Sequence, residues 1–156
     1  MEEGRESEVG AIPCSLEHHR GYGSDTMCHH SFPLPPNAGS VRFSREAIRE
    51  ALAEFGEDAV EAAAILTDEL VTNAIMHGQP PIVLDISEDH GNVTVSVGDA
   101  GPGVPVTRAA QCGALSGRGL TIVDSMSDRW GVDVRQHGKS VWFQLNMRPV
   151  AVGRLD

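Results

Sequence analysis

Apolar residues recur at helical spacing through the middle of the chain. The stretch TDELVTNAIMH, residues 67 to 77, is too long for a typical strand and contains no Gly or Pro, so it predicts a helix. An apolar stripe that can be buried runs along this helix: Leu66, Leu70 and Ala74. The helix would begin at Glu57, where the helix dipole favours acidic residues, and end before Gly78.

A second helix is predicted ahead of this one. Asn37 can cap its start, and Gly56 closes it just after Phe55. The apolar positions of this segment fall on one stripe: Val41, Ile48, Leu52 and Phe55. Residues 27–34 precede the cap and predict a short strand, which the following Pro-Pro pair would stop.

Two stretches further along alternate between apolar and polar residues, which is typical of half-buried strands. Residues 82–87 and 93–98 follow this pattern on either side of a short turn, so they predict a hairpin. A second hairpin is predicted from residues 130–136 and 140–147, with residues 137–139 as its turn. Between the hairpins, a glycine-rich loop leads into a third helix.

The order of elements is strand, two helices, hairpin, glycine loop, helix and hairpin. Such an order allows the helices to collect on one face of a mostly antiparallel sheet, so the predicted fold class is α/β, a two-layer α/β sandwich. We expect one domain over residues 27–148. Residues 1–26 have few large apolar side chains and predict a disordered tail, and residues 149–156 predict a loose C-terminal end.

The composition excludes several classes of function. A formal net charge of −10 argues against a surface for nucleic acid or for an anionic membrane. No apolar run reaches the ~18 residues that span a bilayer, and the polar N-terminus does not resemble a secretory signal. Three cysteines at unpatterned spacings favour reduced thiols in a cytoplasmic protein: Cys14, Cys28 and Cys112.

Histidine and cysteine residues gather near the N-terminus and raise the alternative of a zinc site. They are Cys14, His18, His19, Cys28, His29 and His30. Their spacing matches no compact zinc motif, so a polar tail without a metal is the favoured interpretation.

One edge of the helix over residues 57–77 carries candidate chemistry. Glu69, Asn73 and His77 follow one another at intervals of four residues, so they share a helix face beside the apolar stripe. A carboxylate can take a proton from a hydroxyl group, and an amide oxygen can ligate a hard cation such as Mg²⁺. Taken alone, such a face is typical of a solvated helix, and His77 favours a capping or core role.

Two loops combine glycines with a carboxylate or a helix start. Asp99 ends a strand before the pair Gly101 and Gly103, so its carboxylate should project at the end of the sheet. There it can accept a hydrogen bond from an exocyclic amine such as adenine N6. Gly117 and Gly119 precede the third helix, whose free N–H groups suit phosphates. Neither pair fits a Rossmann or P-loop motif, and each alone is typical of a tight turn.

Taken in order, these stretches resemble the three nucleotide-binding boxes of the GHKL, or Bergerat-fold, ATPases. The sequence ELVTN from Glu69 resembles the N box, DAGPG from Asp99 resembles the first glycine box, and GRGL from Gly117 resembles the second. The similarity covers about residues 30–147. The small size and the short loop between the glycine boxes look most like the stand-alone anti-sigma factor serine/threonine kinases.

This resemblance implies a role for each motif residue. Glu69 would be the general base, Asn73 would ligate the Mg²⁺ that bridges the ATP phosphates, and Asp99 would read adenine. Residues 104–116 would form a lid. The remaining implied ATP-binding residues line the two glycine loops: Gly101, Gly103, Gly117, Arg118, Gly119 and Leu120.

The resemblance also implies a function and partners. The chain would bind and silence a sigma factor and would phosphorylate a serine of a STAS-type anti-anti-sigma protein, with a homodimer formed through the sheet region opposite the ATP site. A second interpretation is a non-catalytic module that uses ATP only to order its partner surface. A third, the ATPase part of a larger machine or sensor kinase, is disfavoured because no dimerisation and phosphoacceptor helix pair is predicted before the domain.

Overall fold

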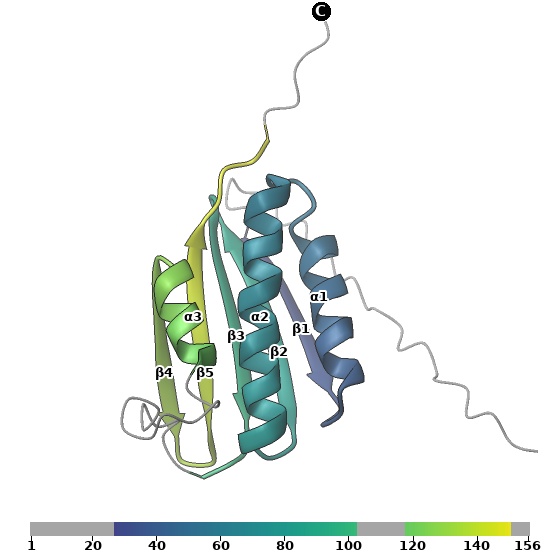
Figure 1. Cartoon of the computed structure of the whole chain (residues 1–156), viewed down its shortest axis with the longest axis vertical. Helices are drawn as coiled ribbons and strands as arrows, with labels where there is room; N and C mark the ends of the chain where they lie inside the picture. The colour runs from purple at the N-terminus through teal and green to yellow at the C-terminus, as the bar shows by residue number, and fades with distance from the viewer. Residues whose placement is uncertain (1–26, 103–117, 151–156) are drawn as a thin grey trace, which may run out of the picture.

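The computed structural model describes residues 27–102 and 118–150. Within these ranges a five-stranded sheet carries three helices on one face (Figure 1). The strands lie in the order β1-β2-β3-β5-β4, and each neighbouring pair is antiparallel. The predicted two-layer α/β sandwich is therefore confirmed. Its elements are β1 (Met27–Leu34), α1 (Gly39–Ala51), α2 (Glu57–His77), β2 (Ile82–Asp89), β3 (Asn92–Asp99), α3 (Arg118–Met126), β4 (Arg129–Arg135) and β5 (Gly138–Asn146).

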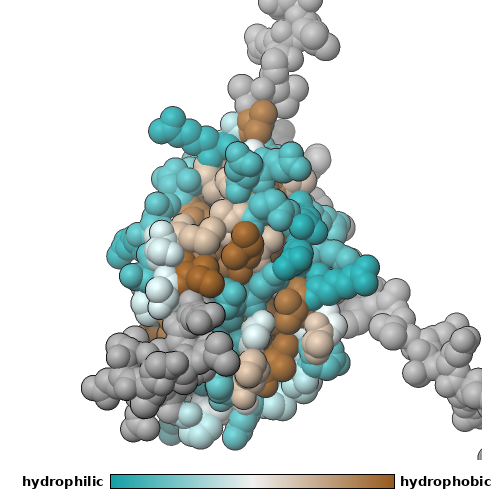
Figure 2. All heavy atoms as spheres, in the orientation of Figure 1, coloured by the Kyte–Doolittle hydropathy of each residue, from teal (hydrophilic) through white to brown (hydrophobic). Residues whose placement is uncertain are grey.

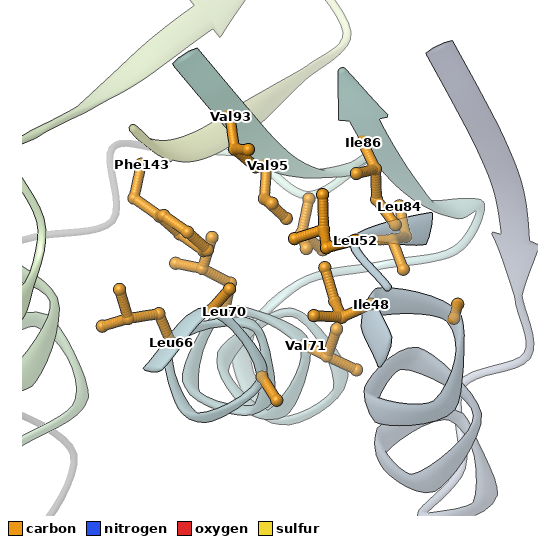
Figure 3. Packing of buried hydrophobic residues seen from close by; sticks show 14 of the residues in the cluster. Ile48, Leu52, Leu66, Leu70, Val71, Leu84, Ile86, Val93, Val95 and Phe143 are labelled. Atoms are coloured by element: carbon orange, nitrogen blue, oxygen red, sulfur yellow. The ribbon is translucent and has the colours of Figure 1, made fainter. Parts of the chain in front are cut away.

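The hydrophobic core fills the space between the helix layer and the sheet (Figure 3). Every second residue of β2 as far as Ile86, and every second residue of β3 from Val93, is buried, because successive side chains of a strand point to opposite faces. Burial of one large apolar side chain contributes about 1.5–3 kcal/mol, so this layer supplies most of the stabilisation of the fold. The buried residues labelled in the figure are Ile48, Leu52, Leu66, Leu70, Val71, Leu84, Ile86, Val93, Val95 and Phe143.

The predicted bounds of β1 and α2 are confirmed, but α1 is shorter than expected. It ends at Ala51 instead of near Phe55. The reason is a contact with a distant part of the chain: Phe55 forms an isolated bridge with Pro149, and the Val150 N–H donates to the carbonyl of Glu54 at 3.1 Å. Pro149 and Val150 begin the segment predicted as a loose end, and these contacts join them to the domain.

The hairpin between β2 and β3 is tighter than the sequence indicated. The expected turn of residues 88–92 is reduced to two residues, His90 and Gly91. Both have positive φ, 49° and 84°, which is the geometry of a type I′ turn. The strands therefore extend to Asp89 and from Asn92.

The face formed by the helices is mostly hydrophilic, with apolar side chains exposed between the polar ones (Figure 2). Among the described residues, no helix is both long and apolar enough to cross a membrane. The exposed large apolar residues of the three helices are Phe43, Ile65, Met76 and Met126.

Candidate functional site

Asp99 is the last residue of β3 and lies buried at the end of the sheet, with 8% of its surface exposed. Oδ1 of its carboxylate accepts hydrogen bonds from the N–H of Gly101 at 2.7 Å and, more weakly, from the N–H of Gln79 at 3.4 Å. The Ala100 N–H donates to the carbonyl of Gln79 at 2.8 Å. The end of β3 is therefore joined to the residues that follow α2, and the predicted strand end at Asp99 is confirmed.

Three glycines pack so closely against Asp99 that none has room for a side chain. A Cβ at Gly78 would lie 2.5 Å from Asp99 Cγ, and a Cβ at Gly101 would lie 2.8 Å from Asp99 Oδ1. Gly138 has a φ of 123°, and a Cβ there would lie 2.2 Å from the Asp99 carbonyl oxygen. Backbone from three segments thus places the carboxylate: the end of α2, the loop after β3 and the start of β5. The sequence indicates Gly101 as part of this site, whereas it indicates Gly78 only as a helix end.

Lys139 also belongs to this site, although it is not among the candidate residues that the sequence indicates. It lies directly opposite Asp99 in the β3–β5 ladder, and its Nζ is 3.1 Å from Asp99 Oδ1. The sequence pattern predicts Lys139 in the hairpin turn, whereas β5 already begins at Gly138. A signal was available in the alternation along β5, because Lys139 is in phase with the buried Val141 and Phe143 and so shares their side of the sheet.

Glu69 and Asn73 lie on the flank of α2 that faces away from α1. On a helix they are rotated by about 100° and about 140° from Asp68, which pairs with α1. α3 packs against α2 on the side opposite α1 (Figure 1). Both side chains are half-buried, and neither forms a hydrogen bond or ion pair with another residue of the described ranges. They are available to a ligand, whereas His77, four residues on, is exposed and takes no part in the core.

The second glycine loop is described only from the start of α3. Arg118 and Gly119 form its first turn, and Leu120 is half-buried and packs against the core. Gly103 and Gly117 lie outside the described residues, as does the predicted lid, residues 104–116. The backbone nevertheless places the start of α3 at the same end of the molecule as the end of α2 and the β4–β5 turn (Figure 1).

Ion pairs fasten α1 to the other flank of α2. Arg45 Nε donates to Asp68 Oδ2 at 3.0 Å, and Arg49 Nε donates to Glu61 Oε1 at 2.8 Å. The hydrogen bonds to these carboxylates raise the pKa of both guanidinium groups, and the hydrogen bond from Arg49 lowers the pKa of Glu61. The Arg49–Glu61 pair is at the surface, where such contacts contribute little to stability, whereas the Asp68 side chain of the other pair is only 14% exposed.

No group of three or more His, Cys, Asp or Glu side chains in the described ranges could hold a metal ion on its own. Cys28, His29 and His30 belong to β1, and the rest of the group considered for zinc lies outside those ranges. A magnesium ion at Asn73 would need most of its ligands from a bound phosphate and from water, as Mg²⁺ commonly does.

The arrangement suits a purine nucleotide. A buried carboxylate acceptor lies at one end of a sheet, glycine backbone packs directly against it, and the start of a helix lies at the same end. Fold and site together define an α/β nucleotide-binding domain. The sequence pattern of the family described as "Histidine kinase-like ATPase domain" matches residues 34–145, and the chain belongs to this family. Membership implies that the domain binds ATP.

Two solved structures resemble the chain. The crystal structure of the RsbU and RsbW domains of Rv1364c from Mycobacterium tuberculosis is 21% identical with a TM-score of 0.61, over 79% of this chain and 33% of that one. The histidine kinase domain of a blue-light activated histidine kinase from Erythrobacter litoralis EL346 is 18% identical with a TM-score of 0.48, over 70% and 60%. The chain thus spans about a third of the length of the first structure. No curated protein sequence matched significantly.

Proposed function

We propose that this chain is an ATP-dependent serine/threonine protein kinase that acts as an anti-sigma factor in the bacterial cytoplasm. Its substrate would be a serine of a STAS-type anti-anti-sigma protein, and its other partner would be a sigma factor. The observation that carries the proposal is the buried Asp99 carboxylate at the glycine-lined end of the sheet, which suits recognition of the adenine amine. The similarity of the fold to a structure that contains an RsbW domain also supports this proposal.

Glu69 is the proposed general base. The serine Oγ would attack the γ-phosphorus, its proton would pass to the Glu69 carboxylate, and ADP would leave. The half-buried position of Glu69, without a hydrogen-bonding or ionic partner among the described residues, supports this role because a base must be free to accept a proton. Asn73, one turn further along α2, would contribute an amide oxygen to Mg²⁺. The metal would supply neutralisation of the charge on the phosphates.

A second candidate function is a binding module that holds ATP and a partner without phosphoryl transfer. Phosphoryl transfer requires positive charge near the phosphates, and the lysine content of the chain favours this alternative. Lys139 is the only lysine of the chain, and the Asp99 carboxylate already offsets its charge, so it adds little neutralisation to a bound phosphate. Both candidates bind ATP, and only the first transfers phosphate.

The substitution Glu69→Gln separates the two candidates. It keeps the size of the side chain and its helix propensity but removes the base, so ATP affinity should survive. Transfer of radiolabel from ATP to a purified STAS-domain partner should fall by about 10²-fold or more, the usual contribution of a positioned general base. Glu57→Gln makes the same change at an exposed position at the start of α2, and it should leave both quantities unchanged.

Each outcome of this experiment has one meaning. Transfer by the wild type that is lost only in Glu69→Gln supports the kinase with Glu69 as its base. Undiminished transfer by Glu69→Gln removes Glu69 from that role. If the wild type binds ATP and the partner but transfers no label, the binding module is the correct function.

A further inference from the structure

The ion pair between Lys139 and Asp99 is buried, and a pair that only stabilised the fold would not need to be charged at this position. Lysine is rarely buried, yet Lys139 is 8% exposed and points to the helix side of the sheet, where the other inward-facing residues of β5 are apolar. Desolvation of an ammonium group is costly even when it is paired, and an apolar pair of the same shape is often at least as stable. A charged pair at the end of the sheet therefore favours a role toward a ligand.

The hydrogen bonds around Asp99 divide its carboxylate into two halves. Oδ1 is saturated, because it accepts from the N–H groups of Gly101 and Gln79 and from Lys139 Nζ. Oδ2 has no hydrogen-bond partner among the described residues. The Lys139 ammonium has three donors and uses one of them on Oδ1. Counted over the described residues, Asp99 therefore leaves one acceptor and Lys139 two donors without a partner, next to the contact that joins the two side chains.

An acceptor next to a donor is complementary to the amidine edge of adenine, where the N6 amine lies beside the N1 ring nitrogen. We propose that Lys139 is a second base-recognition residue: it donates a hydrogen bond to adenine N1 while Asp99 Oδ2 accepts from N6. This inference rests on the proposed ATP site. It assigns base recognition to a charged pair that β3 and β5 bring together, instead of to Asp99 alone.

An ATP analogue in which N1 is replaced by a C–H group, 1-deaza-ATP, tests the contact without changing the protein. It keeps the N6 amine and the triphosphate but offers no acceptor to Lys139. Titration calorimetry should show that the wild type binds it at least about tenfold more weakly than ATP, the loss expected for one hydrogen bond to a charged group. Equal affinities for ATP and 1-deaza-ATP would overturn the assignment.

Substitution of Lys139 shows whether this side chain causes the difference in affinity between ATP and 1-deaza-ATP. Lys139→Met should bind ATP about tenfold or more weakly than the wild type and should bind ATP and 1-deaza-ATP with affinities within about twofold of each other. Arg135→Met removes one positive charge from an exposed position of the same hairpin, and it should keep the wild-type ratio between the two nucleotides. If Lys139→Met also keeps that ratio, Lys139 only supports Asp99 and the proposal is wrong.

A third readout uses the fact that Lys139 is the only lysine. Labelling with [¹⁵N]lysine gives a single side-chain NMR signal, which should shift more on addition of ATP than of 1-deaza-ATP. The same shift with both nucleotides would contradict a contact to N1. If the wild type binds neither nucleotide, both the proposed ATP site and the contact from Lys139 to N1 are wrong. If the wild type binds ATP and 1-deaza-ATP equally well, only the contact to N1 is wrong.

Discussion

At the level of single side chains, recognition of a base at this site depends on the position of the Asp99 carboxylate. Asp99 is the end of a strand, and its Oδ1 is saturated by donors from the protein. The side chain cannot rotate away without breaking several contacts at once. A ligand therefore meets a fixed acceptor, which is the condition for selective recognition of a base edge.

Asp99→Asn tests this recognition directly. One oxygen becomes an NH₂ group, so a donor faces either the Lys139 ammonium or the adenine amine, and a buried donor is left unpaired. We expect ATP affinity to fall by about tenfold to a hundredfold, and the preference for ATP over GTP to narrow. Calorimetric titrations with both nucleotides measure this, with Asp133→Asn at an exposed position of β4 as the control. Unchanged ATP affinity in the Asp99 variant would remove the adenine assignment.

The glycines around Asp99 allow a matched pair of substitutions. In Gly78→Ala, the new methyl group would lie 2.5 Å from Asp99 Cγ and 2.6 Å from the Ala74 carbonyl oxygen, so the carboxylate must move. In Gly98→Ala, one residue before Asp99, the methyl group would meet nothing closer than 3.8 Å. Gly78→Ala should lower ATP affinity by about tenfold or more while Gly98→Ala stays near wild type. Equal affinities of the two variants would show that the position of Asp99 is not critical.

At the level of helices and strands, the spacing of apolar residues predicted the elements correctly where it was regular over a whole segment. The 57–77 segment carries an apolar stripe, acidic residues at its start and a glycine after its end, and all of these agree with α2. The alternation along β2 and β3 likewise agrees with their buried faces. The approximate end of α1 was wrong because Phe55 pairs with Pro149, a contact that no local window contains.

The Lys139–Asp99 pair shows why part of the site could not be predicted. The two residues are 40 positions apart, and they meet only because β3 and β5 pair in one register. A shift of one residue would place Lys139 on the other side of the sheet. Register across non-consecutive strands depends on the whole core, whereas Glu69 and Asn73 could be proposed from one helix.

The contact between α1 and α2 makes the stability sensitive to acid. The hydrogen bond from Arg49 lowers the pKa of Glu61 in the folded state below its unfolded value. The stability contributed by this pair is therefore fully present above the unfolded pKa and is lost as the pH falls through the folded one. Thermal melts of wild type and Glu61→Gln between pH 7 and pH 3 should show a small difference in melting temperature that disappears at the acidic end. A difference that grows toward low pH would contradict the assigned direction of the pKa shift.

For the molecule as a whole, nucleotide binding and folding should be strongly linked. The candidate site draws on α2, β3 and β5, so its parts are far apart in the sequence and come together only in the folded chain. The unfolded chain has no comparable site. A ligand at a hundred times its dissociation constant then stabilises the fold by about 2.7 kcal/mol. For a domain of this size, that corresponds to a rise in melting temperature on the order of 10 °C.

This linkage gives a test of Asn73 that does not depend on phosphoryl transfer. ATP with EDTA should raise the melting temperature of the wild type, and ATP with Mg²⁺ should raise it further, because the ion joins the phosphates to the Asn73 amide oxygen. Asn73→Ala should keep the first rise and lose most of the second. Thr72→Ala, on the neighbouring position about 100° around the same helix, should behave like the wild type. If Asn73→Ala keeps the full increment from Mg²⁺, the ion is held without that side chain. If it loses the rise with ATP alone as well, Asn73 instead supports the nucleotide site as a whole.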